Sequence, residues 1–442
     1  MPDVAVPWGR QDLAITLPDN WTVQQVVKPE LRPAPADWPD RMAEALGQPA
    51  VGLPLGKLLA ARPGGKVAVI VEDMTRHSPL SEILPILLRE LDHARVDRAN
   101  LEVVFATGMH PPLTAAQARA KLGPLASELR WRCNPWHDRK AYIRVGNVGK
   151  VSVLVDRGVA GADLRIIVSS VSPHLQAGFG GGYKMLVPGC APRETIRVLH
   201  RQGLGRGASQ LVGSDAEANA MRQAIDAAGA LIDQAHGRTF AVQYLLDGDD
   251  RPSAVAAGDV VPTQRMLAKQ CAAACGVATP APADVLVTNA FPRDFDLWQS
   301  FKGIANTLWA ARPNGVVVCL ARCEAGVNGM ARPPRWPFNQ RWTRRILRAV
   351  GPETLGAIVM RLVPRLAGDA AFFIRMAAQM LNRNPIILAS PTLHAAGVKF
   401  PGLVILPTAG DAIAAASALL GNGPQRATVF PYGGITFPVP TA

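Results

Sequence analysis

The chain has 442 residues, of which 48% are hydrophobic and 18% charged, and its formal net charge is +13. This composition excludes a disordered chain, and the length favours two domains over a single core. The basic residues are mostly arginine and are scattered along the chain, which favours an anionic small molecule over a nucleic acid as the partner.

Neither a targeting segment nor a membrane span is predicted. Residues 1–13 lack a basic region followed by an apolar core, and no apolar run reaches the ~18 residues that a spanning helix needs. We therefore expect a cytoplasmic protein. The six cysteines include two C-x-x-x-C pairs, at 271/275 and 319/323, but without neighbouring histidines they predict small buried residues rather than a zinc site.

Strand-like and helix-like segments alternate through the first half of the chain. After a proline-rich lead, apolar β-branched runs predict buried strands, and each is followed by a polar loop and a helical pattern. Strands and helices are expected in turn at 66–72, 81–94, 101–107, 114–123, 163–170 and 192–200. This order predicts a mostly parallel, doubly wound sheet, in which ligands bind beyond the carboxyl ends of the strands.

The second half repeats the pattern after an alanine-rich helix at 215–235 and an Ala/Pro-rich linker at 271–283. Its strands are expected at 284–289, 315–321, 384–390 and 402–407, and its helices at 295–311 and 411–420. We therefore predict an α/β protein with two domains, each a mostly parallel sheet flanked by helices. Residues 1–275 would form the N-terminal domain, to which a tail at 421–442 could return as a strand, and 276–420 would form a capping domain.

Polar side chains follow three of the strands of the first half. Because carboxyl ends of parallel strands meet at one edge, we expect these side chains to converge. Taken singly, a D-x-T-R turn or a loop histidine is more often structural than functional. Together they predict a site with an acid–base pair and an anion-binding arginine. The residues are Asp73, Thr75, Arg76, His110, His174 and Lys184.

Three further groups each allow two interpretations. Lys184 follows the glycine run 180–182 and either contacts a phosphate or reacts as a desolvated amine, but Met185 excludes a Walker A loop. His200 is either a helix-end charge or a metal ligand. Gln299 and Lys302, three residues apart, share a helix face that is either simply exposed or part of a substrate site.

In their order and spacing these motifs resemble those of the nickel-pincer lactate racemase family. The resemblance spans nearly the whole chain and both predicted domains. Its motifs are D-x-T-R at 73–76, T-G-x-H ending on His110, His174, the glycine loop ending in Lys184, Pro-Gly at 188–189, His200, and Q-x-x-K at 299–302.

The resemblance implies an isomerase that racemises or epimerises C2 of a 2-hydroxy acid by hydride transfer to and from a nickel-pincer nucleotide, a Ni(II) pyridinium-3,5-bisthiocarboxylate mononucleotide. It implies that the cofactor is covalently linked to Lys184, that His200 binds nickel, and that His110 and His174 alternate as acid and base. The implied cofactor contacts are Asp73, Met74, Thr75, Arg76, Gly181 and Gly182, and the implied substrate ligands are Arg76, Gln299 and Lys302. The site is expected in the interdomain cleft, and cofactor-maturation enzymes are expected partners.

Some positions depart from the residues common in the family, namely His77, Pro111, Gly180 and Tyr183. They leave the reaction class intact and the identity of the small anionic substrate open. Trp298 and the Arg/Trp-rich segment 333–342 are candidates for shaping the pocket. Two other functions stay open: a dinucleotide-dependent 2-hydroxyacid dehydrogenase, although no G-x-G-x-x-G motif joins a strand to a helix, and a non-catalytic basic nucleotide-binding protein.

Overall fold

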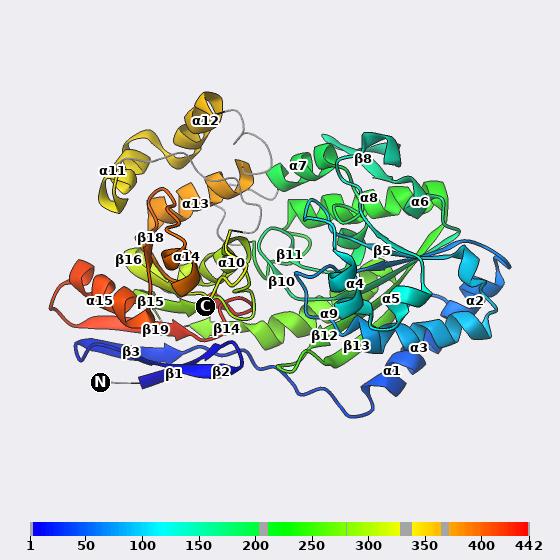
Figure 1. Cartoon of the computed structure of the whole chain (residues 1–442), viewed down its shortest axis with the longest axis horizontal. Helices are drawn as coiled ribbons and strands as arrows, with labels where there is room; N and C mark the ends of the chain where they lie inside the picture. The colour runs from blue at the N-terminus through cyan, green and yellow to red at the C-terminus, as the bar shows by residue number, and fades with distance from the viewer. Residues whose placement is uncertain (1–2, 203–210, 280, 328–337, 364–370, 441–442) are drawn as a thin grey trace. The chain divides into compact units, whose positions relative to one another are not determined.

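The computed structural model describes residues 3–202, 211–279, 281–327, 338–363 and 371–440 (Figure 1). The chain divides into two compact units. The first unit comprises residues 31–203 and 214–274, and the second comprises 1–30, 204–213 and 275–442, each as far as the structure describes them. None of the described helices is long and apolar enough to cross a membrane.

The first unit is built on a six-stranded sheet. Its central strands read as continuous Val/Ile runs because both faces are covered, and only the pair β12–β13 is antiparallel. The order across the sheet is β13 (Pro252–Asp259), β12 (Arg238–Leu246), β9 (Leu164–Ser170), β4 (Val67–Val71), β5 (Leu101–Phe105) and β6 (Trp131–Cys133).

Two layers of helices cover this sheet. Side chains that alternate along β4 face α1 (Trp38–Gly47), α2 (Leu55–Ala60), α3 (Leu80–His93) and α4 (Ala115–Leu122) on one side. The other side packs against α6 (Arg157–Ala160), α7 (Arg193–Gln202), α8 (Ala220–His236) and α9 (Val260–Cys275). Smaller elements are α5 (Leu125–Glu128) and the hairpins β7–β8 (Tyr142–Val148, Val151–Asp156) and β10–β11 (Pro173–His174, Gly178–Phe179).

The strand order changes direction between the two central strands, β4 and β9. The chain moves from β4 outward through β5 and β6, then returns to the other side of β4 as β9 and continues through β12. In open α/β sheets such a reversal leaves the loops of the two central strands diverging, and ligands bind between them. The loops after β4, β5 and β9 therefore share one edge of the first unit.

The second unit has a six-stranded sheet that is entirely parallel. Its order is β18 (Val404–Leu406), β17 (Ile386–Ala389), β16 (Ala311–Leu320), β15 (Ala283–Asn289), β19 (Gln425–Phe430) and β3 (Trp21–Val26). Its helices are α10 (Leu297–Thr307), α11 (Gln340–Val350), α12 (Pro352–Leu362), α13 (Ala371–Arg383), α14 (Pro391–Ala395) and α15 (Ala409–Leu420). Two two-stranded sheets complete it: β1–β2 (Asp3–Trp8, Gln11–Thr16) and β14–β20 (Gly276–Thr279, Phe437–Pro440).

The predicted α/β class and the parallel character of both sheets are confirmed. The predicted linker at 271–283 is wrong. Helix α9 continues to Cys275, and residues 276–279 form β14, which pairs with β20. Cys271 and Cys275 are buried, so this alanine-rich stretch is a packed helix end. Alanine is the best helix former, and composition alone did not distinguish helix from linker here.

The structure also divides the chain differently from the predicted 1–275 and 276–420. Residues 1–30 belong to the second unit, because β3 pairs with β19 along its length. The tail 421–442 does not return to the first unit, because β19 inserts between β15 and β3 and β20 pairs with β14. Both corrections concern strand partners that lie far apart in the sequence.

This division predicts that two tryptophans support different units. Trp21 in β3 is 2% exposed in the core of the second unit, and Trp38 in α1 is 6% exposed in the core of the first. Trp21→Ala should cost about 3–5 kcal/mol and should speed amide hydrogen exchange in β15 and β19 but not in β4 and β9. Trp38→Ala, the matched variant, should speed amide hydrogen exchange in β4 and β9 but not in β15 and β19. Loosening of β4 and β9 by Trp21→Ala would contradict the division.

Candidate active site

The loop after β4 is folded around the carboxylate of Asp73. This side chain is 6% exposed, and its Oδ1 accepts hydrogen bonds from the backbone N–H of Thr75 (2.9 Å) and from the Thr75 hydroxyl (2.6 Å). Arg76 in turn donates to the Thr75 hydroxyl oxygen (3.0 Å), while the side chain of Met74 is 39% exposed. An Asp side chain that accepts a hydrogen bond from the backbone N–H two residues later forms a local turn. This turn holds Asp73 and Arg76 close together.

Asp73 also joins this loop to the loop after β5. Its Oδ2 lies 2.5 Å from Nδ1 of His110. Burial alone would raise the pKa of Asp73, but the charge and hydrogen bond of His110 and the charge of Arg76 outweigh it and hold the pKa well below its ordinary value. The carboxylate therefore accepts a hydrogen bond from the Nδ1–H of His110. This leaves Nε2 of His110 for proton exchange.

His174 is held differently, by backbone amides. It lies in the short hairpin β10–β11, and its Nδ1 accepts from the N–H groups of Gln176 (3.2 Å) and Ala177 (3.1 Å). The Gln176 side chain then donates to the carbonyl oxygen of His200 (3.0 Å). The turn that carries His174 is thus tied to the helix that carries His200.

The glycine loop needs its glycines for steric reasons. Gly181 and Gly182 have φ of +72° and +65°, a region that side chains disfavour. A Cβ on Gly181 would lie 2.9 Å from both Gln243 and Val171. The loop leads into the 3₁₀ turn η3 (Gly182–Met185), which carries Lys184.

Lys184 and His200 are both shifted towards their neutral forms. Burial, followed by the charges of Arg76 and Arg222, lowers the pKa of Lys184 to about 7. Burial, followed by the charges of Lys184 and His110, lowers the pKa of His200, on α7, to about 4. These mutual effects require Arg76, His110, Lys184 and His200 to lie within electrostatic range of one another, as the shared sheet edge predicts.

The donor set at this edge fits a metal that is already coordinated by an organic cofactor. In the described parts of the chain, no three His, Cys, Asp or Glu side chains come together to hold an ion. His200 nevertheless presents a neutral imidazole, the form that binds metals, within electrostatic range of an amine that is partly uncharged near neutral pH. One nitrogen ligand beside a nucleophilic amine suits a tethered cofactor that supplies the remaining ligands itself.

Gln299 and Lys302 lie in the second unit, on α10. Asp296 caps this helix by accepting from the backbone N–H of Gln299 (2.7 Å), and the Lys302 ammonium donates to the Gln299 side-chain oxygen. They share a face, as their spacing predicts, while their role towards a substrate stays a prediction. Of the segment 333–342, residues 333–337 lie outside the described residues.

Two charged residues that hold the Asp73 loop were not predicted. Glu72 is 5% exposed and accepts from the hydroxyl of Ser170 at the end of β9 (2.9 Å). Lys121, on α4, is 8% exposed and donates to the carbonyl oxygens of Arg76 (2.5 Å) and Ser78 (3.2 Å). Glu72 directly follows a buried strand and could have been found by the same rule as Asp73, whereas nothing in the helical pattern around Lys121 marks it.

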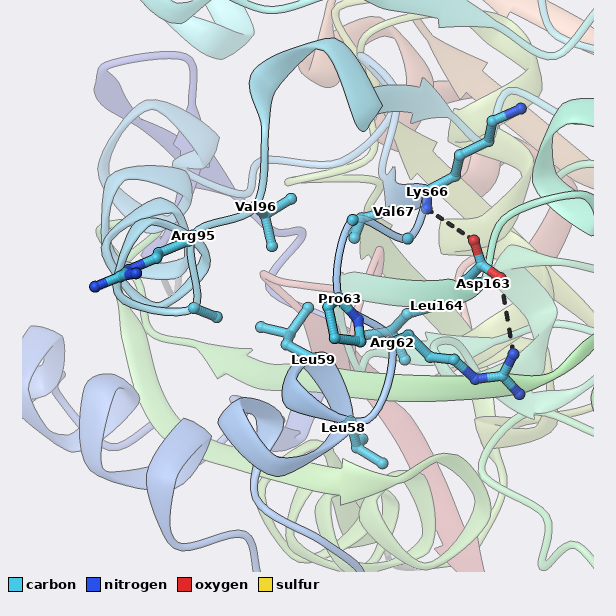
Figure 2. Close-up of a pocket in the computed structure, with 13 residues that line it drawn as sticks. Leu58, Leu59, Arg62, Pro63, Lys66, Val67, Arg95, Val96, Asp163 and Leu164 are labelled. Carbon is cyan, nitrogen blue, oxygen red and sulfur yellow. Dashed lines mark hydrogen bonds and ion pairs between the residues drawn. The ribbon is translucent and has the colours of Figure 1, made fainter.

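A small hollow in the first unit lies at the opposite edge of the sheet (Figure 2). It is formed where β4 and β9 begin, and there the backbone N–H of Lys66 donates to Asp163 (2.9 Å), which Arg62 approaches at 3.9 Å. None of the candidate site residues lines it. The candidate chemistry therefore belongs to the carboxyl edge and not to this hollow.

Comparisons with known proteins identify relatives of this chain. Residues 8–211 match a family model described as the lactate racemase N-terminal domain. A lactate racemase of Thermoanaerobacterium thermosaccharolyticum is 26% identical over 341 residues, which cover 74% of this chain and 76% of that protein. A lactate racemase of Lactiplantibacillus plantarum is 24% identical over 278 residues, which cover 61% of this chain and 63% of that protein.

Solved structures show the same fold. The lactate racemase apoprotein of T. thermosaccharolyticum superimposes with a TM-score of 0.83 at 21% identity, covering 99% of this chain and 100% of that one. A protein of Thermotoga maritima gives a TM-score of 0.65 at 17% identity, covering 91% and 98%. The similarity to two lactate racemases marks this α/β protein as an isomerase. Over residues 8–211 it carries the N-terminal domain of the lactate racemase family.

The lowered pKa of Lys184 predicts a pH-dependent stability of the apoprotein. The ordinary value is 10.5 and the folded value about 7, so between these pH values the unfolded chain binds more protons and the free energy of unfolding rises with pH. Lys184→Met removes the buried charge. It should therefore be more stable than the parent at about pH 6, and this gain should vanish by about pH 10.

Denaturant unfolding at both pH values measures this difference. Lys57→Met, at an exposed position on α2, is the matched control and should change stability equally at both. A stability gain of Lys184→Met that does not depend on pH would contradict the assigned pKa.

Proposed function

We propose that this protein racemises or epimerises C2 of a small anionic 2-hydroxy acid with a nickel-pincer nucleotide held by Lys184 and His200. The observation that carries the proposal is the pair of shifted groups: an amine with a pKa of about 7 beside an imidazole with a pKa of about 4. Both are electrostatically coupled to the Asp73–His110 loop pair, in a chain that carries the N-terminal domain of the lactate racemase family.

The candidate residues would hold the cofactor by covalent attachment, by metal binding and by further contacts. Lys184, partly uncharged at neutral pH, is the site of covalent attachment, and His200 offers its lone pair to nickel. Gly181, Gly182 and the loop 73–76 provide further contacts. When bound, this group supplies a reversible acceptor for the hydrogen and electron pair that leave C2.

The chain's own histidines move the hydroxyl proton. His110 takes it at Nε2, because the Asp73 carboxylate 2.5 Å from Nδ1 stabilises the imidazolium that results. His174 is the second member of the acid–base pair, and two backbone N–H groups hold its Nδ1. The two histidines are therefore oriented by different partners, a carboxylate for His110 and backbone amides for His174.

The substrate carboxylate requires cationic and amide donors. Arg76 provides a guanidinium in the first unit, next to Asp73 and His110. Gln299 and Lys302, on α10 of the second unit, are proposed to bind the same carboxylate. A guanidinium and an ammonium together favour an anionic substrate over an uncharged one.

A dinucleotide-dependent dehydrogenase fits the site less well. The order of strands in the first unit is that of dinucleotide-binding sheets, but those sheets place a glycine-rich turn after the first strand for the pyrophosphate. Here β4 is followed by Glu72 and Asp73, two buried acidic residues. Their charge would repel a pyrophosphate at that position.

Protein produced together with cofactor-maturation enzymes should carry about one nickel per chain and an added mass on Lys184. Inductively coupled plasma analysis and peptide mass mapping measure the two. The loaded protein should then interconvert the enantiomers or epimers of at least one member of a panel of 2-hydroxy acids. Chiral chromatography measures this interconversion.

Two variants separate attachment from metal binding. Lys184→Ala should lose the added mass, whereas His200→Ala should keep it and lose nickel. Two results would refute the proposal. One is parent protein that was produced with the maturation enzymes but carries neither nickel nor added mass, and the other is turnover by protein produced without these enzymes.

Replacement of either histidine should remove exchange but not the cofactor. His110→Ala and His174→Ala should each retain nickel and lose about 10²–10⁴ in turnover. In the parent, activity should fall at acid pH because both imidazoles must be neutral at some point in the cycle. His93→Ala, at an exposed end of α3, is the control and should behave as the parent. Full turnover in both histidine variants, or a profile that stays flat into the acid range, would contradict the assignment.

A further inference from the structure

We propose that one face of helix α8 positions Lys184, through Arg222, Gly229 and Asp233. These residues are seven and eleven positions apart in the helix, so they lie on one face. All three contact the glycine loop or the turn that follows it. The inference rests on the proposed role of Lys184 as the attachment point and names what holds that lysine in place.

Arg222 holds the glycine loop by its carbonyl oxygens. It is 1% exposed and donates to the carbonyl oxygens of Ala177 (3.4 Å), Phe179, Gly180 (3.5 Å) and Gly181 (3.3 Å). A planar guanidinium has five donors and can serve four carbonyl oxygens, whereas an ammonium has only three donors. The loop conformation therefore depends on this one buried side chain.

Arg222 is itself held in place by charge. Asp226, one turn along α8, lies 3.6 Å from its guanidinium and also pairs with Arg265. Gln264 on α9 adds a donor to the carbonyl oxygen of Gly180 (3.1 Å). A buried cation without such a partner would be costly, so the Asp226 carboxylate allows Arg222 to remain charged beneath the loop.

Gly229 receives the ring of Tyr183, the residue before Lys184. A Cβ on Gly229 would lie 2.0 Å from Cγ of Tyr183 and 2.2 Å from its Cδ1, so the ring packs directly on the helix backbone. Glycine in a helix interior is less favourable than alanine, and α8 is otherwise rich in alanine. The close approach of the tyrosine ring gives this glycine a reason.

Asp233 fixes the other end of the same ring. The Tyr183 hydroxyl donates to Oδ2 of Asp233 (2.6 Å), while Oδ1 accepts from Thr239 (2.5 Å) and from Arg165 (3.3 Å). Tyr183 is 8% exposed, and Arg165 is fully buried. With ring and hydroxyl both held, the backbone of η3 is fixed at Tyr183, and the next residue in this turn is Lys184.

Variants of this face test the proposal. Gly229→Ala and Arg222→Met should lower the fraction of chains that carry the added mass on Lys184 by about tenfold, at equal amounts of folded protein. Amide hydrogen exchange in residues 178–186 should become faster in both. Tyr183→Phe keeps the volume and loses only the hydroxyl, so it should give a smaller loss in the same direction.

Matched controls separate positioning from general destabilisation. Gly56→Ala is also a helical glycine, but its Cβ would meet nothing within 4 Å, and Tyr142→Phe removes another buried tyrosine hydroxyl, which donates to Asn134 (2.7 Å). Both should form the Lys184 adduct and protect residues 178–186 as the parent does. Arg222→Lys, which keeps the charge but not the fork, should recover adduct formation only in part.

The possible outcomes point in different directions. Parent-like adduct formation and loop exchange in folded Gly229→Ala and Arg222→Met would overturn the positioning role. So would losses no larger than those of a control variant with the same melting temperature. If the parent itself carries no adduct, the proposed function fails, and loop exchange in the same variants still decides whether α8 positions the turn.

Discussion

The proposed chemistry depends on keeping Lys184 and His200 neutral. An ammonium is not a nucleophile and an imidazolium does not bind metal, so both groups act only through a free lone pair. Burial disfavours the charged form of each, and electrostatic interactions add to the effect, with Arg76 and Arg222 at Lys184 and with Lys184 and His110 at His200. Asp73 and Glu72 oppose the shift at Lys184 but do not overcome it. The remaining features of the first unit bring these groups together.

Shape and reactivity are coupled through one residue, Arg222. Its guanidinium holds the carbonyl oxygens of the glycine loop and also helps to lower the pKa of Lys184. Burial lowers the pKa of Arg222 itself to about 10, so it is still charged at neutral pH. A side chain that shaped the loop without this charge would leave the amine more fully protonated. The same arginine therefore helps to position Lys184 and, after burial and Arg76, helps to lower its pKa.

The parts of the site that could be predicted follow from topology. Asp73, His110 and Lys184 were placed on one edge because the carboxyl ends of parallel strands meet there wherever each strand stops. Arg222 and Gly229 could not be found this way, since the helical pattern of 215–235 does not say which loop its face meets. The pairing of β3 with β19 was also out of reach, because the two segments are about 400 residues apart.

The two units divide the expected tasks. The residues assigned to cofactor attachment and proton transfer, Lys184, His200, His110 and His174, all lie in the first unit on one sheet edge. Gln299 and Lys302 lie in the second, on a helix capped by Asp296 and unconnected in sequence to that edge. Since the groups that set proton transfer do not depend on α10, the residues around the substrate can change while the reacting groups keep their geometry. The departures His77 and Tyr183 lie in the first unit instead, where Tyr183 supports the turn of Lys184, and neither replaces a residue assigned to the reaction.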